Sequence, residues 1–140
     1  NIITAIEGYQ PTNNRSQLIK KKSNTLLLDA YNANPTSILV ALDNFSSIKH
    51  SSKVAILGDM FELGEYAFDE HENIVAYCKN LDIHRCIFVG EEFSKTTALE
   101  KYKNFEKLKT EIKKSPLKNS YVLIKGSRGM YLERLLEIIN

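Results

Sequence analysis

The feature that most constrains the fold is a series of four short apolar runs, each followed by a segment with helical spacing of its apolar residues. The runs are TLLLDA (25–30), KVAILG (53–58), RCIFVG (85–90) and YVLIKG (121–126), and the helix-like segments are PTSILVALDNF (35–45), FDEHENIVAYCKNL (68–81), FSKTTALEKY (93–102) and GMYLERLLEII (129–139). Because the central residues of the runs are nearly all apolar, both faces of each strand are expected to be buried. The alternation predicts an α/β fold with a mainly parallel sheet and helices on both faces.

The length of the chain suits a single compact domain. Its 140 residues, 43% of them hydrophobic, are enough to bury a core without disulfides or metals. We interpret residues 1–17 as the end of a preceding helix and an interdomain linker, and residues 18–140 as the domain. Because the first residue is Asn1 and not Met, we expect the chain to be a piece of a longer protein.

Charge and cysteine content narrow the class of partner and the compartment. The formal net charge is only +2, and the lysines at 20–22 and 101–118 are typical of solvated faces, so no nucleic-acid partner is predicted. Cys78 and Cys86 lack the spacing of a zinc site, and unpaired thiols fit a reducing compartment. No apolar run approaches the roughly 18 residues of a membrane span, which predicts a cytoplasmic location without membrane association.

Polar residues gather where the predicted strands end. Right-handed crossovers place the carboxyl ends of parallel strands at one edge of a sheet, and ligands bind at that edge. The loops expected there are 29–34, 58–64, 90–93 and 125–129.

The first loop, DAYNANPTS (29–37), contains a carboxylate, an aromatic ring and two amides, which is more than a surface turn requires. Asn34 is a favoured N-cap and Pro35 suits the first helical position, so these two residues are explained by the helix that follows. A strand-end carboxylate such as Asp29 can accept hydrogen bonds from the two hydroxyls of a ribose, while Tyr31 and Asn32 can face a purine. The alternative is that Asp29 binds backbone donors of a neighbouring loop.

The second loop, GDMFELGE (58–65), is acidic. Asp59, Glu62 and Glu65 could orient an amine or a metal. Alternatively, Gly58 and Gly64 shape the loop and the acids are solvated. His71 lies near the apolar face of the next helix, where a structural hydrogen bond is the more common role of a histidine. Since the sequence offers no further ligands for it, no metal site is predicted.

The fourth loop, IKGSRGM (124–130), favours an anion. Lys125 ends a strand, Gly126 could let a ligand approach the backbone, and Ser127 and Arg128 lie near the start of the last helix. A carboxylate or a phosphate would be held well there. The alternative is a loop with an exposed lysine and arginine.

Two common nucleotide-binding motifs are absent. No G-x-x-x-x-G-K-S/T sequence occurs, and no G-x-G-x-x-G follows the first strand, so the chain cannot hold a triphosphate through a P-loop. A phosphorelay receiver domain has an aspartate and a lysine at strand ends, as Asp59 and Lys125 would be. It also needs an acidic pair after its first strand and a proline after the lysine, whereas here Asp29 stands alone and Gly126 follows the lysine.

Taken together, the motifs are more specific than any one of them. NNRSQ, DAYNANP, KVAILGDMFELGE and IKGSRGMYLE follow one another over nearly the whole chain. In this combination the sequence resembles the carboxy-terminal domain of the Mur ligases, and most closely the members that add D-alanyl-D-alanine to UDP-N-acetylmuramoyl-tripeptide. The resemblance implies a Rossmann-like domain, the last of three. The family's other domains carry the UDP-sugar site, the P-loop and the Mg²⁺ ligands.

The resemblance also implies a reaction and its partners. In the family, ATP phosphorylates the terminal carboxylate of the tripeptide to an acyl phosphate, which the amine of D-alanyl-D-alanine attacks during peptidoglycan precursor synthesis. The fragment alone would then be inactive. Rival interpretations are the corresponding domain of another Mur or folylpolyglutamate-type ligase, and a non-catalytic nucleotide-binding or receiver-like module.

Site residues follow from the resemblance motif by motif. The residues that match positions near ATP are Arg15, Asp29, Tyr31, Asn32 and Asn34. Those that match positions near the incoming dipeptide are Lys125, Ser127 and Arg128. Asp59, Glu62 and His71 match family positions without an assigned role. Ala30 replaces a serine that is common before the tyrosine, which removes one hydroxyl contact.

Overall fold

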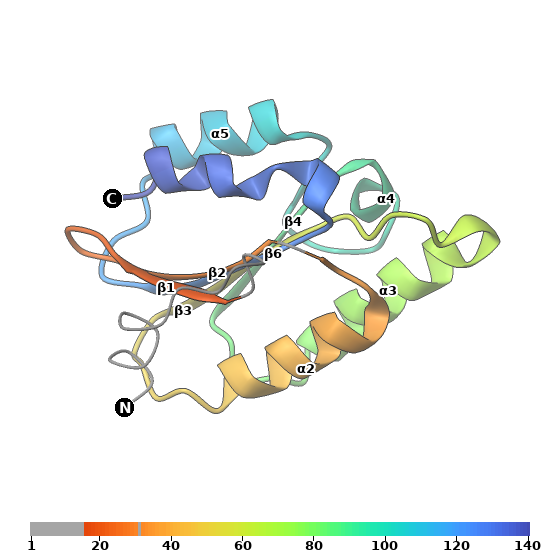
Figure 1. The fold of residues 1–140 in the computed structure, drawn as a ribbon, viewed down its shortest axis with the longest axis horizontal. Helices are drawn as coiled ribbons and strands as arrows, with labels where there is room; N and C mark the ends of the chain where they lie inside the picture. The colour runs from red at the N-terminus through yellow and green to blue at the C-terminus, as the bar shows by residue number, and fades with distance from the viewer. Residues whose placement is uncertain (1–15, 31) are drawn as a thin grey trace.

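The computed structural model describes residues 16–30 and 32–140 and contains a six-stranded sheet (Figure 1). The strands are β1 (Gln17–Lys20), β2 (Thr25–Asp29), β3 (Lys53–Gly58), β4 (Arg85–Val89), β5 (Lys101–Tyr102) and β6 (Tyr121–Lys125). Their order is β1-β2-β6-β3-β4-β5, in which β1 pairs antiparallel with β2 and every other pair is parallel. The predicted α/β fold with a mainly parallel sheet is confirmed.

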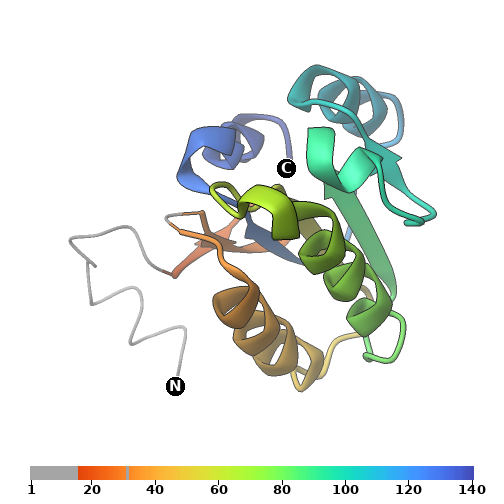
Figure 2. The same cartoon turned by 90° about the vertical axis from the view of Figure 1, so that its right-hand side faces the viewer.

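Helices cover both faces of the sheet (Figures 1 and 2). They are α2 (Pro35–Ser46), α3 (Ala67–Cys78), α4 (Glu91–Ser94) and α5 (Phe105–Lys114), with 3₁₀ helices η1 (Gly64–Tyr66), η2 (Arg128–Met130) and η3 (Leu132–Glu137). Helices α2 and α3 lie on one face, and α5 and η3 lie on the other. No helix of the described ranges is long and apolar enough to cross a membrane.

The strands supply alternate residues to two cores. Leu26, Ile56 and Ile124 pack towards α5 and η3, whereas Leu57 and Leu123 pack towards α2 and α3. Since successive side chains of a strand point to opposite faces, burial of both faces requires continuous apolar runs. The central strands were therefore predictable from these continuous apolar runs in the sequence.

The segment predicted to form a helix over 93–102 is instead a short helix, a turn and a strand. Helix α4 ends at Ser94, and β5 follows at Lys101. The Ser94 and Thr96 hydroxyls donate hydrogen bonds to the carbonyls of Glu91 and Phe93, at 2.7 and 2.6 Å. Such side-chain bonds compete with a continuing helix, and β-branched threonines disfavour one. The helix that packs against β4 on the opposite face from α4 is α5, which begins after the N-cap Asn104.

The predicted last helix over 129–139 is also altered. It consists of η2 and η3, separated by Tyr131 in the left-handed conformation at φ 52°. The predicted domain start at residue 18 lies one residue inside β1, which begins at Gln17. Residues 1–15 lie outside the described ranges, so the division into linker and domain stays a prediction.

Candidate functional site

An ion pair joins two neighbouring strands at the carboxyl edge of the sheet. Asp29 and Lys125 are the last residues of β2 and β6 and are partners in the parallel register. Residues in register point to the same face, here the face covered by α2. The Lys125 Nζ atom lies 3.1 Å from Asp29 Oδ2, and the lysine is 2% exposed.

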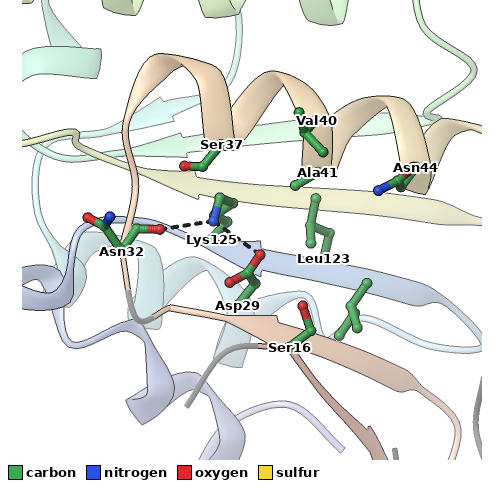
Figure 3. A pocket seen from close by; sticks show the side chains of 10 residues that line it. Ser16, Asp29, Asn32, Ser37, Val40, Ala41, Asn44, Leu123 and Lys125 are labelled. Atoms are coloured by element: carbon green, nitrogen blue, oxygen red, sulfur yellow. Dashed lines mark hydrogen bonds and ion pairs between the residues drawn. The ribbon is translucent and has the colours of Figure 1, made fainter. Parts of the chain in front are cut away.

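Lys125 also holds the loop that follows β2. Its ammonium donates a hydrogen bond to the Asn32 carbonyl oxygen at 2.9 Å. Figure 3 shows Lys125 between Asp29 and Asn32, with both contacts drawn. A single buried cation thus connects the end of β2 with the segment leading into α2.

A pocket of about 580 Å³ opens beside this ion pair. Asp29, Asn32 and Lys125 form its polar end (Figure 3). The rest of the wall is made of β-strand and α2 side chains and the residue before β1: Ser16, Leu27, Ser37, Val40, Ala41, Asn44 and Leu123. A pocket of this size, apolar with a few convergent polar groups, suits a small organic molecule.

The α2 part of this wall was missed by the sequence reasoning. Ser37, Val40, Ala41 and Asn44 lie at helical spacing and share one face of α2. This face adjoins the buried face of α2, formed by Ile38, Leu42 and Phe45, and the sequence carries no signal that separates it from an ordinary exposed helix face.

Asn34 caps α2, as predicted. Its side-chain oxygen accepts a hydrogen bond from the Ser37 N–H at 2.8 Å, and the Ser37 hydroxyl accepts one from the Asn34 N–H at 3.0 Å. Pro35 occupies the first helical turn. This reciprocal capping box fixes where the loop ends and α2 begins. Arg15 and Tyr31, predicted to lie near ATP, fall outside the described residues.

Ser127 ties two loops together. Its hydroxyl accepts a hydrogen bond from the Phe61 N–H at 2.8 Å, and its own N–H donates to the Asp59 carbonyl at 3.0 Å. Gly126 lies against the β3 backbone: a Cβ on it would come within 3.0 Å of Gly58 Cα. The glycine therefore allows close packing of two loops, which is a different reason from the predicted approach of a ligand.

Arg128 lies elsewhere. It lines a second pocket of about 330 Å³ together with Tyr131, Glu133, Leu28 and other residues of β1, β2 and η3. Leu28 belongs to the core on the α5 face, so this pocket is on the opposite side of the sheet from the first. The structure thus brings Lys125 together with Asp29 and Asn32, and separates it from Arg128.

Asp59 is 3% exposed and anchors α4. Its carboxylate accepts hydrogen bonds from the N–H groups of Glu92 and Phe93 at 2.9 and 3.0 Å. Gly90 leaves room for it, since a Cβ there would collide with the carboxyl group. Burial raises the pKa of Asp59, and the two N–H groups oppose this by stabilising the carboxylate.

His71 has the structural role that the sequence favoured. It is fully buried, its Nε2 accepts a hydrogen bond from the Met60 N–H at 3.0 Å, and its Nδ1 lies 2.6 Å from the Ala67 carbonyl. Because Nε2 is an acceptor, the ring proton belongs on Nδ1 and the ring is neutral. Glu62 is exposed in the left-handed conformation at φ 65°. Within the described ranges, no group of three or more His, Cys, Asp or Glu side chains could hold a metal ion.

The geometry can be compared with known proteins. A family model described as Mur ligase, glutamate ligase domain, matches residues 14–128. The UDP-N-acetylmuramoyl-tripeptide–D-alanyl-D-alanine ligase of Treponema pallidum is 34% identical over 93% of this chain and 30% of its own length. The ligase of the same name from Bacillus subtilis is 32% identical over 94% of this chain and 32% of its own length.

Solved structures agree with the fold. MurF ligase from Thermotoga maritima, in complex with ADP, matches with a TM-score of 0.72 and 25% identity over 93% of this chain and 31% of that protein. MurF from Acinetobacter baumannii matches with a TM-score of 0.76 over 97% of this chain and 32% of that protein, at 24% identity.

The matched region is short relative to these proteins. The chain spans about 30% of the length of the curated relatives it matches, and a similar share of the solved structures. The family model nevertheless covers most of the chain, including β1 to β6 and the loops at their carboxyl ends. The chain belongs to the Mur ligase family and contains its glutamate ligase domain.

Proposed function

We propose that this chain is the carboxy-terminal domain of an ATP-dependent ligase that joins D-alanyl-D-alanine to UDP-N-acetylmuramoyl-tripeptide in cytoplasmic peptidoglycan precursor synthesis. The observation that carries the proposal is the match of nearly the whole chain to ligases of that name, together with the polar pocket at the carboxyl edge. The bond formed is an amide, and ATP supplies the driving force by way of an acyl phosphate.

The nucleotide is assigned to the pocket beside Asp29. A carboxylate at a strand end can accept hydrogen bonds from two neighbouring ribose hydroxyls, and Asp29 is placed there with its side chain 21% exposed. The pocket volume suits a nucleoside, and the Thermotoga maritima relative was solved with ADP. Arg15, Tyr31, Asn32 and Asn34 are proposed to lie beside the nucleotide. Asn34 would contribute through its backbone, since its side chain caps α2.

The amino component is assigned to the other loops. Arg128 is the cation proposed for the carboxylate of the dipeptide, because a guanidinium binds a carboxylate through two parallel hydrogen bonds. Ser127 is proposed to hold this loop in place, since its two hydrogen bonds join it to residues 59–61.

The domain's contribution to the reaction is orientation. Holding nucleotide and amine in fixed positions can lower the barrier by as much as roughly 7–11 kcal/mol, and excluding water protects an acyl phosphate from hydrolysis. Asp59 and His71 would serve this indirectly by keeping the loop after β3 rigid. The described residues do not fit a Mg²⁺ site by themselves, so no step here is routed through the metal.

The proposal is tested in the complete enzyme with Asp29→Ala. If the carboxylate binds the ribose, the KM for ATP rises roughly tenfold or more, as expected when a charge-assisted hydrogen bond is lost. Because Asp29 is also the partner of the buried Lys125, the variant is expected to unfold at a lower temperature, and its KM is measured at a temperature where it is folded. Asp69→Ala is the matched control, because Asp69 is exposed in the first turn of α3 and outside the pocket. An unchanged KM for ATP would remove Asp29 from the site. Preference for another amino component over D-alanyl-D-alanine would overturn the substrate assignment.

A further inference from the structure

We propose that Lys125 is a positioning residue for the nucleotide and not a ligand of the dipeptide carboxylate. The inference rests on the proposed function. It reassigns the first residue of the KGSR motif from the amino component to the opposite side of the site. Lys125 acts through Asp29 and the loop that ends at Asn34.

The Lys125 side chain points to the α2 face of the sheet. Lys125 and Asp29 are register partners on adjacent strands, so both point to the α2 face. Arg128, three residues further on, lines the pocket on the α5 face. Two cations that are close in the sequence therefore line different pockets, and Arg128 is the one on the second face.

The Lys125 ammonium already has two partners. Lys125 is 2% exposed, and among the described residues its contacts are Asp29 Oδ2 at 3.1 Å and the Asn32 carbonyl at 2.9 Å. Two of its three N–H donors are thereby used, and its positive charge is already offset by the Asp29 carboxylate. A substrate carboxylate bound to the same ammonium would lie beside Asp29 and be repelled by it, so this binding mode is disfavoured.

The ion pair with Lys125 engages one of the two carboxylate oxygens of Asp29. Lys125 occupies Oδ2, and in the described part of the chain no hydrogen bond reaches Oδ1. Oδ1 is thereby left as an acceptor for a ligand hydroxyl on the pocket side. The same ammonium offsets the negative charge of Asp29, which would otherwise repel the phosphates of a bound nucleotide. Lys125 thus both orients the Asp29 carboxylate and offsets its charge.

Lys125 also holds the segment that leads from β2 into α2. The Asn32 carbonyl is held by Lys125, and two residues later the capping box fixes Asn34 at the start of α2. The loop between β2 and α2 is therefore fixed at both ends. Loss of the ammonium would remove the hydrogen bond to the Asn32 carbonyl, so that Asn32 would no longer be held in one position in the pocket wall.

The test is a double-mutant cycle in the complete enzyme with Asp29→Asn, Lys125→Met and both changes. We expect Lys125→Met to raise the KM for ATP about tenfold, the size of coupling between directly paired charges, and to leave the KM for D-alanyl-D-alanine within about twofold. Because Lys125 acts through Asp29, the double variant is expected to be no worse than the worse single variant. ADP affinity, measured by calorimetry, follows the same pattern.

Lys53→Met is the matched control. Lys53 is as deeply buried as Lys125, its ammonium donates to the carbonyls of Ser46 and Ile48 at 2.7 Å and lies 3.5 Å from Asp82 Oδ2, and it is not among the residues that line the pocket. This variant should lower stability without changing the KM for ATP. A purely structural role for Lys125 would give the same result as Lys53→Met and would overturn the proposal.

Two further outcomes overturn it: additive effects of the single changes, or a raised KM for the dipeptide with that for ATP unchanged. If Lys125→Met fails to fold, Lys125→Arg keeps the charge but not the geometry, and its ADP affinity gives the same discrimination. If the wild-type enzyme does not ligate D-alanyl-D-alanine, the proposed function fails, yet the ADP measurements still test the role of Lys125.

Discussion

Individual side chains at the carboxyl edge divide into two groups. In the first group, side-chain atoms accept hydrogen bonds from backbone N–H groups of neighbouring loops and hold those loops in place; its members are Asp59, His71 and Ser127. Asp29 and Asn32 instead line the open pocket. Residue type does not separate the groups, because Asp29 and Asp59 both end or follow a buried strand. What separates them is whether a loop N–H lies within reach.

That distinction sets the limit of prediction at this scale. The N-cap role of Asn34 and the structural role of His71 could be predicted because caps and helix faces depend on local sequence. The partner of Lys125 could not, because it depends on the position of β6 beside β2. The chain segments involved are 96 residues apart. Strand order is a property of the whole sheet.

Glu100 offers a test of pH dependence at the residue scale. Burial raises the pKa of its carboxyl, but hydrogen bonds from Arg85 and Tyr102 outweigh this and hold the pKa below the usual 4.5. Arg85 binds both carboxylate oxygens, with Nε at 2.7 Å from Oε1. Because the pKa is lower in the folded state, the stabilisation is present above about pH 4.5 and is lost as the pH falls through the folded value.

The variant Glu100→Gln should therefore be less stable than the wild type near neutral pH, by roughly 0.5–1 kcal/mol for a partly exposed pair. The difference should shrink as the pH falls below about 4.5 and through the folded-state pKa of Glu100, because the protonated carboxyl is then uncharged, as the amide is. Urea unfolding at a series of pH values measures it. A difference in the free energy of unfolding that stays constant with pH would mean that the ion pair between Glu100 and Arg85 contributes nothing to stability.

At the scale of elements, α2 connects stability to function. The helix begins at a capping box, supplies one wall of the pocket and ends near the buried ammonium of Lys53. A cation at the carboxyl end of a helix satisfies its last carbonyls and interacts favourably with the helix dipole. Both ends of α2 are therefore satisfied, and the capping box is the end that adjoins the polar part of the pocket.

Asn34→Ala should lower the free energy of unfolding by about 1 kcal/mol, because an N-cap acceptor is lost. Asn34→Ser should restore most of this, since serine also caps well. The matched control is Asn104→Ala, which removes the corresponding cap of α5, where Asn104 accepts from the Lys107 N–H at 3.0 Å. Thermal or urea unfolding of the three variants measures the stability.

The same variants separate the two roles of Asn34. If its side chain serves only the cap, Asn34→Ser in the complete enzyme leaves the KM for ATP unchanged. A KM that rises in Asn34→Ser but not in Asn104→Ala would show that the amide also contacts the nucleotide.

Elements differ in how far the sequence predicts them. The central strands β3, β4 and β6 were predictable because both faces are buried and the runs are continuous. Strand β5 was not, since two residues leave no periodicity. The helix-like spacing in 93–102 was misleading because local hydroxyl-to-carbonyl bonds end α4 early. Pattern is reliable where burial dictates it and weak where a few side-chain hydrogen bonds decide.

The whole domain presents different pockets on the two faces of one sheet edge. The pocket with Asp29 is on the α2 face, and the pocket with Arg128 is on the η3 face. Two hydrogen bonds of Ser127 and the close packing of Gly126 on Gly58 join the loops between them. Under the proposed function, this places nucleotide and amine on either side of a shared, rigid rim.

The last prediction concerns the isolated chain. Two hydrophobic cores flank the sheet, so the 140-residue chain is expected to fold alone as one cooperative unit. Because the chain has no tryptophan, far-ultraviolet circular dichroism and tyrosine fluorescence are the probes, and their urea transitions should coincide. Transitions that differ between probes would mean that the chain does not unfold as one cooperative unit.

Folding alone should not give activity. The sequence contains no P-loop, and the chain spans about 30% of the length of its curated relatives. Under the proposed function, the isolated folded chain, incubated with ATP, UDP-N-acetylmuramoyl-tripeptide and D-alanyl-D-alanine, is therefore expected to form no amide and release no phosphate, whereas the complete enzyme is expected to do both. ADP should shift its melting temperature little, since only one wall of the nucleotide site is present and stabilisation depends on affinity. Amide formation by the fragment would contradict the assignment of catalysis to the other domains.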